Sequence, residues 1–353
     1  MGLKFEHVTL GQRVLFGMGL AGANLAAEVA RLGANRVMVI SSASEARRLA
    51  AVMDNISVAL HYGDVAPHVP LEKAEKARAA AAESDIDLIV CAGGGSTTGL
   101  AKAVALTLRL PIIAIPTTYA GSEATNVWGL TEASRKTTDL DDAVLPVTVI
   151  YDAALTLGLP VELSVASGLN ALAHCIDSMW APRADPINAA LAAEGIRALN
   201  MALPAIKADP LEPFGREHAL YGAYLSAVAF ASAGSGMHHK ICHVLGGAYN
   251  LPHAQTHAII LPHVLAFNAP SAPEARDRIA AAFGTSRALD GLNALQETLN
   301  APTALKDYGL PQESIPDAVQ LILPAIPPSN PREVTAESLE ELLHRAHTGA
   351  PVL

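Results

Sequence analysis

The sequence predicts two domains: an α/β domain with a Rossmann-like parallel sheet over residues 1–155, and an all-α domain over residues 156–353. In the first part, short apolar stretches alternate with helical patterns, which is typical of a doubly wound parallel sheet. In the second part, the pattern is helical almost throughout and rich in Ala and Leu. A chain of 353 residues is long enough to form two cores.

The expected elements follow in chain order. Strands are expected at residues 13–17, 37–41, 56–63, 87–95, 111–118 and 143–152. Helices are expected between them at residues 22–33, 44–53, 73–84 and 97–108, and a hairpin at 127–139. The second domain is expected to contain helices at residues 161–180, 188–205, 214–232, 236–246, 253–267, 275–283, 287–299, 303–307, 312–323 and 335–346. Lys102 and Arg135 are interpreted as surface or helix-end charges.

The composition argues against several classes of function. Apolar residues make up 51% of the chain and charged residues 16%, which suggests extensive burial and a subunit interface. The net charge of −10 argues against a nucleic-acid partner and against an anionic membrane surface. Cys91, Cys175 and Cys242 are too scattered for a disulfide framework. Because the sequence shows neither a signal peptide nor a membrane-spanning run, we expect a cytoplasmic protein.

A glycine-rich turn is the strongest signal for a phosphate ligand. Gly93-Gly94-Gly95-Ser96 follows an expected strand and opens a helix, where backbone N–H groups could bind a pyrophosphate. The alternative is a plain tight turn. A second polar turn, PTTYAGSE at residues 116–123, follows the next strand, and cofactors bind at the carboxyl edge of open sheets. We therefore expect a dinucleotide at this edge.

The end of the second strand bears on the choice of nicotinamide cofactor. An acidic residue at this position commonly contacts the ribose of a dinucleotide. Here the strand ends at Ser41, and the first carboxylate is Glu45. Because a serine does not repel a 2′-phosphate as a carboxylate would, we expect both NADH and NADPH to be used.

Residues 236–257 carry a cluster of five histidines: His238, His239, His243, His253 and His257. His239 and His243 are four residues apart and would share a helix face, and the other pair at this spacing follows Pro252. Gly246 and Gly247 are expected to end the first of the two helices. A single histidine is most often a core or capping residue, whereas two such pairs favour a functional site.

Asn170 and His174 repeat the four-residue spacing upstream. With His239 and His253 they would supply one amide and three imidazoles to one place. Three imidazoles and a carboxylate would form a convincing divalent-metal site, and its ligands here would be His174, His239 and His253. An amide oxygen is a weaker, uncharged ligand, so we expect no metal.

These motifs resemble those of the iron-containing alcohol dehydrogenases, which have a dehydroquinate synthase-like fold. The matching stretches cover nearly the whole chain: GGGSTTGLAK (93–102), PTTYAGSE (116–123), NALAH (170–174), GMHHKICHVLGG (236–247) and LPH (251–253). The resemblance implies a homodimer with an active site in the cleft between the two domains. It implies that these residues contact the cofactor: Gly94, Gly95 and Ser96 at the pyrophosphate, Thr117, Thr118 and Ser122 at the nicotinamide side, and Lys136.

The chain departs from the metal-dependent members of this family. Asn170 stands where they have Asp, and Gly99 stands where they have a second Asp. His174, His239 and His253 match the metal-binding histidines of the family. The missing carboxylate agrees with a metal-free site.

The forms PTTYAGSE and HHKICH resemble members that reduce the C=C bond of maleylacetate, a dicarboxylate from aromatic-compound degradation, to 3-oxoadipate. Hydride from NADH or NADPH would reach the carbon β to the ketone. The enolate would be stabilised by Asn170, His174, His239 and His253. His243 is the candidate proton donor, with His253 as the second choice. Tyr119 and Lys240 are candidates for binding the substrate carboxylates, although packing and surface roles are open for them.

Three alternatives remain open from the sequence. A metal-dependent alcohol or polyol dehydrogenase would bind zinc or iron. A dehydroquinate-synthase-like lyase would not consume NADH stoichiometrically. A helical interaction protein with an inherited nucleotide fold agrees least with the intact glycine turn and the five histidines.

Overall fold

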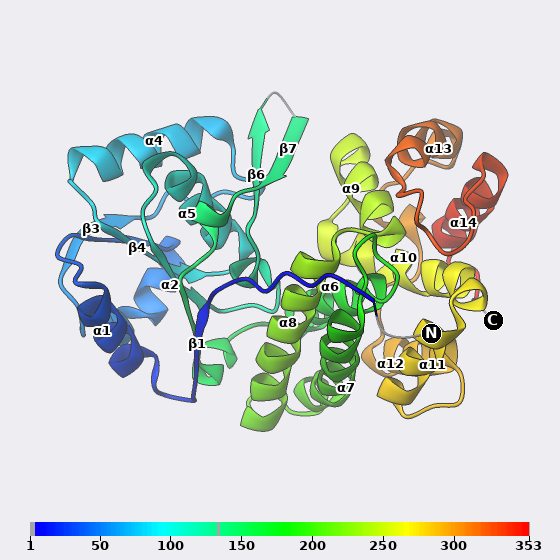
Figure 1. The fold of residues 1–353 in the computed structure, drawn as a ribbon, viewed down its shortest axis with the longest axis horizontal. Helices are drawn as coiled ribbons and strands as arrows, with labels where there is room; N and C mark the ends of the chain where they lie inside the picture. Colours follow the sequence, from blue (N-terminus) through cyan, green and yellow to red (C-terminus); the bar gives the residue numbers. More distant parts are fainter. Residues whose placement is uncertain (1–3, 133–134, 353) are drawn as a thin grey trace. The chain divides into compact units, whose positions relative to one another are not determined.

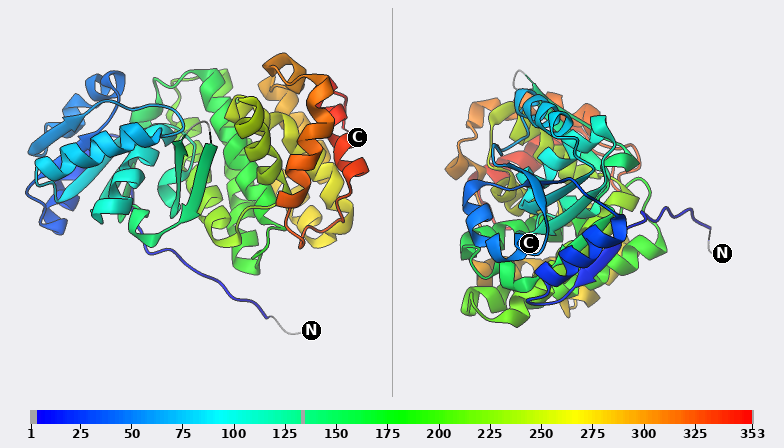
Figure 2. Two further views of the ribbon diagram at one scale, coloured as in Figure 1. Left: turned by 90° about the horizontal axis from the view of Figure 1, so that it is seen from above. Right: turned by 90° about the vertical axis from the view of Figure 1, so that its left-hand side faces the viewer.

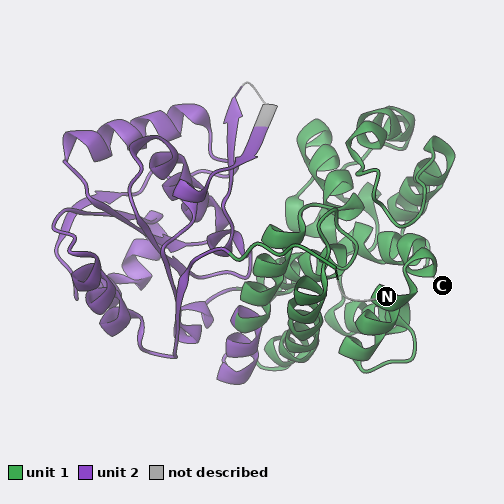
Figure 3. Ribbon diagram, in the orientation of Figure 1, with its two compact units in different colours: residues 1–9, 160–210, 221–353 green, residues 10–159, 211–220 purple. Residues whose placement is uncertain are grey.

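The chain was analysed as a computed structural model, which describes residues 4–132 and 135–352. It contains two compact units, shown in different colours in Figure 3. The sheet unit comprises Leu10–Leu159 and Leu211–Leu220. The helical unit comprises Met1–Thr9, Pro160–Pro210 and Tyr221–Leu353. The main division of the chain therefore falls after Leu159, whereas the sequence placed a domain boundary after residue 155.

The sheet unit is built on one parallel sheet, which confirms the expected fold class. Its strands are β1 Arg13–Phe16, β2 Val37–Ile40, β3 Val58–Tyr62, β4 Leu88–Gly93, β5 Ile112–Pro116 and β8 Thr148–Tyr151. Their order in the sheet is β1-β8-β5-β4-β2-β3, and every neighbouring pair is parallel. Figure 1 shows these strands in the blue to green part of the chain.

Helices cover both faces of the sheet. They are α1 Ala21–Leu32, α2 Ala43–Arg48, α3 Ala50–Met53, α4 Leu71–Glu83 and α5 Gly95–Leu108. Strand residues alternate between two cores because successive side chains point to opposite faces. Met38 and Cys91 pack with α4 and α5, whereas Val39 and Val90 pack with α1 and α3. The arrangement can be followed in the two views of Figure 2.

The sheet unit differs from the sequence expectation in one helix. The expected helix at 44–53 is divided into α2 and α3, because Leu49 leaves helical geometry with a ψ of 7°. The expected hairpin at 127–139 is present as the antiparallel strands β6 Val127–Glu132 and β7 Arg135–Leu140. Residues 133 and 134 between them lie outside the described part of the chain.

The second half of the chain is helical, as the sequence predicts. Its helices are α6 Val161–Ser178, α7 Pro186–Ala208, α8 Pro213–Ala233, α9 Met237–Tyr249, α10 His253–Asn268, α11 Pro273–Phe283, α12 Ala288–Leu299, α13 Ile315–Ile322 and α14 Ala336–Thr348. The expectation that Gly246 and Gly247 end a helix is wrong, because α9 continues through both. It ends at Asn250, whose left-handed φ of 53° reverses the chain. Pro252 then precedes α10, as expected.

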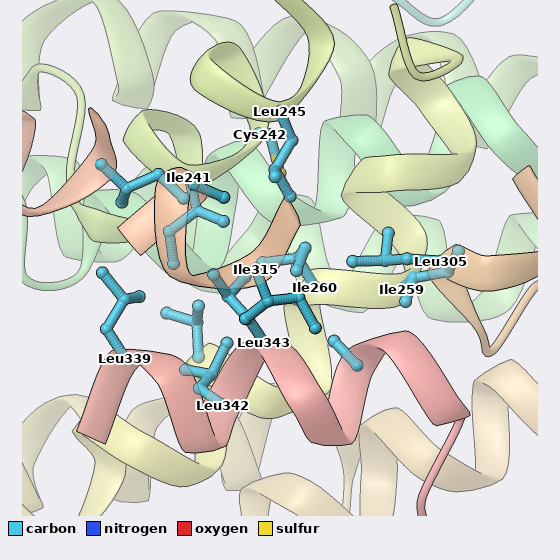
Figure 4. Close-up of a cluster of buried hydrophobic side chains, with 14 of the residues drawn as sticks. Ile241, Cys242, Leu245, Ile259, Ile260, Leu305, Ile315, Leu339, Leu342 and Leu343 are labelled. Atoms are coloured by element: carbon cyan, nitrogen blue, oxygen red, sulfur yellow. The ribbon is translucent and has the colours of Figure 1, made fainter. Parts of the chain in front are cut away.

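One apolar core joins α9, α10, α13 and α14. Figure 4 shows Leu339, Leu342 and Leu343 of α14 pointing toward Ile260 and Ile315. Ile241, Cys242 and Leu245 of α9 belong to the same fully buried cluster. This packing therefore holds α9 and α10, the two helices that carry the five histidines, against α13 and α14. Within the described residues, no helix combines the length and apolarity needed to cross a membrane.

Lys102 is buried in α5, so the interpretation of this residue as a surface charge is wrong. Only 2% of the residue is exposed. Its ammonium donates to Thr125 O at 2.8 Å, Thr125 Oγ1 at 3.0 Å and Val127 O at 2.8 Å. Burial lowers the pKa of Lys102 to about 7, although the nearby Glu123 acts in the opposite direction. The lysine thus joins α5 to the start of β6 by donating to three acceptors, two of them on the buried Thr125.

Replacing Lys102 by Met should destabilise the protein, because the substitution leaves buried carbonyl groups without donors. We expect the free energy of unfolding to fall by about 2–4 kcal/mol. Urea unfolding followed by circular dichroism measures this change. Lys306→Met, at an exposed lysine, is the matched control. Equal unfolding midpoints for the two variants would contradict the structural role of Lys102.

Candidate active site

The glycine turn lies where β4 ends and α5 begins. Gly93 closes β4 with a φ of 154°, and a Cβ placed on it would lie 2.6 Å from Thr97 Oγ1. Gly94 is the N-cap of α5 and has no side chain that could cap the helix. The backbone N–H groups of Gly94, Gly95 and Ser96 therefore lie at a helix N-terminus, the arrangement that binds phosphate groups.

The second polar turn lies against the first. A Cβ placed on Gly94 would lie 3.1 Å from Thr118 Cγ2, and one placed on Gly95 would lie 3.9 Å from Ser122 Oγ. The N–H of Thr117 donates to Gly93 O at 3.1 Å. The structure thus brings together the two turns that were predicted separately. Ser122 Oγ is buried without a hydrogen-bond partner in the described structure, and a bound ligand could satisfy it.

The end of β2 carries the other candidate cofactor residue. Ser41 is buried, and its N–H donates to Tyr62 O at 3.2 Å. The nearby carboxylate of Glu45 accepts at its Oε1 from Thr117 Oγ1 and Arg48 Nη1, each at 3.3 Å, and its Oε2 is buried without a hydrogen-bond partner in the described structure. Lys136 lies in β7 opposite Thr131, and its side chain is outside the described part of the structure.

Tyr119 and Lys240, the candidates for binding carboxylates, lie in different units. Tyr119 is fully buried in the sheet unit, and Arg216 Nη1 donates to its hydroxyl at 3.1 Å. Arg216 is also fully buried, and its Nη2 donates to Leu159 O at 3.0 Å. This contact gives Tyr119 a structural role in the turn. Lys240 is half-buried on α9, next to His239.

In the helical unit, α6, α9 and α10 bring the predicted histidines together. The ring centroids of His174 and His239 are 4.9 Å apart, and the two planes differ by 15°. The ring of His257 lies 5.0 Å from that of His239 and 4.3 Å from that of His253. His243 stacks with His253 at 6.3 Å. The convergence expected from the spacing is therefore present.

The amide of Asn170 belongs to α6, one turn before His174. Asn170 is buried, and its Oδ1 has no hydrogen-bond partner among the described residues. His174 Nδ1 is likewise buried without a partner. Buried polar atoms of this kind are rare in folded proteins, and they mark places where a ligand or water completes the hydrogen bonding.

A buried carboxylate orders this cluster, and the sequence analysis missed it. Asp177 on α6 is fully buried. Its oxygens accept from the backbone N–H groups of Gly236 at 2.8 Å and His238 at 3.3 Å, and from Nδ1 of His239 at 2.7 Å. A signal for it was present, because Asp177 follows His174 by three residues and so shares its helix face.

The contact with Asp177 fixes the tautomer of His239. Two backbone N–H groups donate to this carboxylate and favour its ionised form, although burial raises the pKa of Asp177. An ionised carboxylate only accepts hydrogen bonds, so His239 Nδ1 carries a proton and Nε2 of the neutral ring carries a lone pair. This Nε2 is buried and has no partner in the described structure.

Burial determines the charge state of the inner histidines. It lowers the pKa of His174, His238, His239 and His257 well below the usual value, and neighbouring imidazoles lower each of them further. A second positive charge in such a cluster is unfavourable for the same reason. At neutral pH the inner rings are therefore neutral.

The three histidines that match the family's metal ligands have no charged ligand beside them in this chain, because Asn170 brings no negative charge. The carboxylate of Asp177 contacts Nδ1 of His239 and leaves Nε2 free, a contact that metal-binding histidines also make. Within the described residues, one group of His, Cys, Asp or Glu side chains has all its ligand atoms within 4.8 Å of one another. That group is His238, Cys242 and His257, and it contains none of the matching histidines.

Two family models together match most of the chain. Residues 11–153 match the model described as iron-containing alcohol dehydrogenase. Residues 164–347 match the model of the C-terminal part of the Fe-containing alcohol dehydrogenase family. The two matches correspond to the sheet-forming and helical halves of the chain.

Individual relatives agree with these matches. Maleylacetate reductase from Sphingobium indicum is 45% identical over 352 residues, 99% of each chain. The crystal structure of an iron-containing alcohol dehydrogenase from Corynebacterium glutamicum has 61% identity, a TM-score of 0.98 and 99% coverage of both chains. That of maleylacetate reductase from Agrobacterium tumefaciens has 40% identity and a TM-score of 0.94, with 98% of this chain and 99% of that chain covered. The chain therefore belongs to the iron-containing alcohol dehydrogenase family, and its sequence groups with maleylacetate reductases.

Proposed function

We propose that this oxidoreductase reduces the C=C bond of maleylacetate to give 3-oxoadipate, with NADH or NADPH as the hydride donor. The observation that carries the proposal is the cluster of imidazoles that includes His174, one turn after Asn170 on α6, in a chain 45% identical to a maleylacetate reductase. A cluster without a charged metal ligand suits a reaction in which N–H groups stabilise the developing charge.

The chemistry sets three requirements for the site. Maleylacetate carries two carboxylates and a C=C bond conjugated to a ketone. When hydride adds to the carbon β to the ketone, negative charge develops on the ketone oxygen. The enolate must be stabilised, and the carbon next to the ketone must receive a proton. Imidazoles are suited to both tasks because they donate hydrogen bonds and exchange protons near neutral pH.

The proposal assigns the cofactor to the sheet unit. Gly94, Gly95 and Ser96 would bind the pyrophosphate through backbone N–H groups. Thr117, Thr118, Ser122 and Lys136 would line the nicotinamide side, and Ser41 would lie near the adenosine ribose. The adjacency of the two polar turns and the unpartnered hydroxyl of Ser122 support this assignment.

In the helical unit, Asn170, His174 and His253 would donate to the enolate, and His243 would supply the proton, with His253 as the alternative. His239 has a different part in this proposal. Its neutral ring turns the Nε2 lone pair toward the cluster, so in this proposal it accepts a hydrogen bond there instead of donating one. Asp177 would hold the ring in this tautomer.

The reaction itself is the first test. We expect NADH absorbance to fall when maleylacetate is added, with one cofactor consumed per product formed. A chelator should leave the rate unchanged, because no metal takes part in the proposed step. Absence of NADH consumption would overturn the proposed function. A rate that falls on chelation and returns with iron would instead favour the metal-dependent alternative.

Cofactor preference tests the assignment of Ser41. We expect kcat/KM for NADH and for NADPH to differ by less than about a hundredfold, since no free carboxylate is assigned to the ribose. Steady-state rates at limiting cofactor measure the ratio. Ser41→Asp should shift the ratio toward NADH by repelling the 2′-phosphate. If the wild type prefers one cofactor by more than this limit, a residue other than Ser41 determines which ribose is accepted.

Replacing Asp177 by Asn should slow the reaction, because an amide at this position can donate to Nδ1 of His239 and so change the tautomer that Asp177 fixes. We expect kcat to fall by about 10–100-fold, the usual effect of losing a carboxylate behind a functional histidine. KM should change little. Nitrogen NMR of labelled histidine would show whether the His239 tautomer has changed, and circular dichroism would check folding. An altered tautomer with unchanged kcat would contradict the role assigned to Asp177.

A further inference from the structure

The helices α9 and α10 enclose a second group of reactive side chains, which the proposed reaction does not use. His238 and Cys242 are four residues apart on α9, and His257 belongs to α10. At most 1% of each residue is exposed. Cys242 also packs in the apolar core with Ile241 and Leu245, as Figure 4 shows. Two imidazoles and a thiol thus meet in the interior, between the apolar core and the rings of His239 and His253.

The geometry of the three side chains approaches that of a metal site. His238 Nε2 lies 2.9 Å from His257 Nδ1 and 3.7 Å from Cys242 Sγ. All ligand atoms of the group lie within 4.8 Å of one another. A tetrahedral zinc ion with ordinary bond lengths separates two nitrogen ligands by about 3.3 Å, and nitrogen from sulfur by about 3.6 Å. Only a small outward movement of the two rings would therefore be needed.

We propose that His238, Cys242 and His257 bind a thiolate-seeking transition metal ion, Zn²⁺ or Cu⁺, between α9 and α10. Thiolate and imidazole are the ligands that these ions prefer. On binding, Cys242 gives up its S–H proton to solvent, and each imidazole donates one nitrogen lone pair. No electron is transferred. The ligands belong to adjacent helices of one unit, so the ion would join α9 to α10.

The ring atoms that the proposed ion would use are the two that face each other, His238 Nε2 and His257 Nδ1. The other two nitrogens, His238 Nδ1 and His257 Nε2, are buried without hydrogen-bond partners in the described structure and would carry the ring protons when the ion is bound. With three protein ligands the ion would have an open fourth position, and these ligands are distinct from His174, His239 and His253.

Metal content of the full chain tests the inference, and it does not depend on the proposed reaction. The protein is produced in medium supplemented with zinc or with copper, so that an ion can enter during folding. Inductively coupled plasma mass spectrometry then measures the metal per chain. We expect about one ion per chain for the wild type in one of the two media. Wild-type protein without metal above background in both would overturn the proposal.

Variants locate the ion. Cys242→Ala and His257→Ala should lose it, whereas Cys175→Ala, at another fully buried cysteine, and His174→Ala should retain it. Retention by Cys242→Ala, or loss from His174→Ala alone, would overturn the assignment. Because a core variant could fold poorly, Co²⁺-grown wild-type protein provides a second measurement. It should show a thiolate-to-cobalt charge-transfer band, and its absence from cobalt-loaded protein would exclude Cys242 as a ligand.

Discussion

The hydrogen bonds of one buried carboxylate hold the candidate active site of the helical unit in place. Asp177 contacts the chain before α9 through Gly236, the first turn of α9 through His238, and the ring of His239. Gly236 is needed for this close approach, because a Cβ there would lie 2.5 Å from Asp177 Oδ1. The position of α9 against α6, and with it the orientation of the imidazoles, depends on this group.

The sheet unit depends on a different kind of constraint. Its two polar turns are positioned by the parallel strands β4 and β5, which end side by side and are buried on both faces. The positions of main-chain groups therefore determine the shape of the phosphate turn, whereas contacts between side chains determine the arrangement of the histidines. Lys102 contributes to the sheet unit by donating to the carbonyl groups of Thr125 and Val127, just before and at the start of β6.

Periodicity and glycine placement predicted the sheet, most of the helices and the convergence of the histidines, because these follow from local patterns. The sequence could not show which nitrogen of His239 carries a proton, because that depends on Asp177, 62 positions away along the chain. Lys102 was misjudged because lysine is usually exposed, and only the tertiary structure supplies its three acceptors. Gly246 and Gly247 were misjudged because α9 is held by tertiary packing, which outweighs the weak helix propensity of glycine.

The role of Asp177 has an evolutionary consequence. A carboxylate of the protein orients His239, whatever occupies the centre of the cluster. Under the proposed function, the amide at position 170 and the carboxylate of the metal-dependent members that the chain resembles would act beside the same set of rings. A change of charge at this one position would then alter the chemistry of the site without any rebuilding of the backbone.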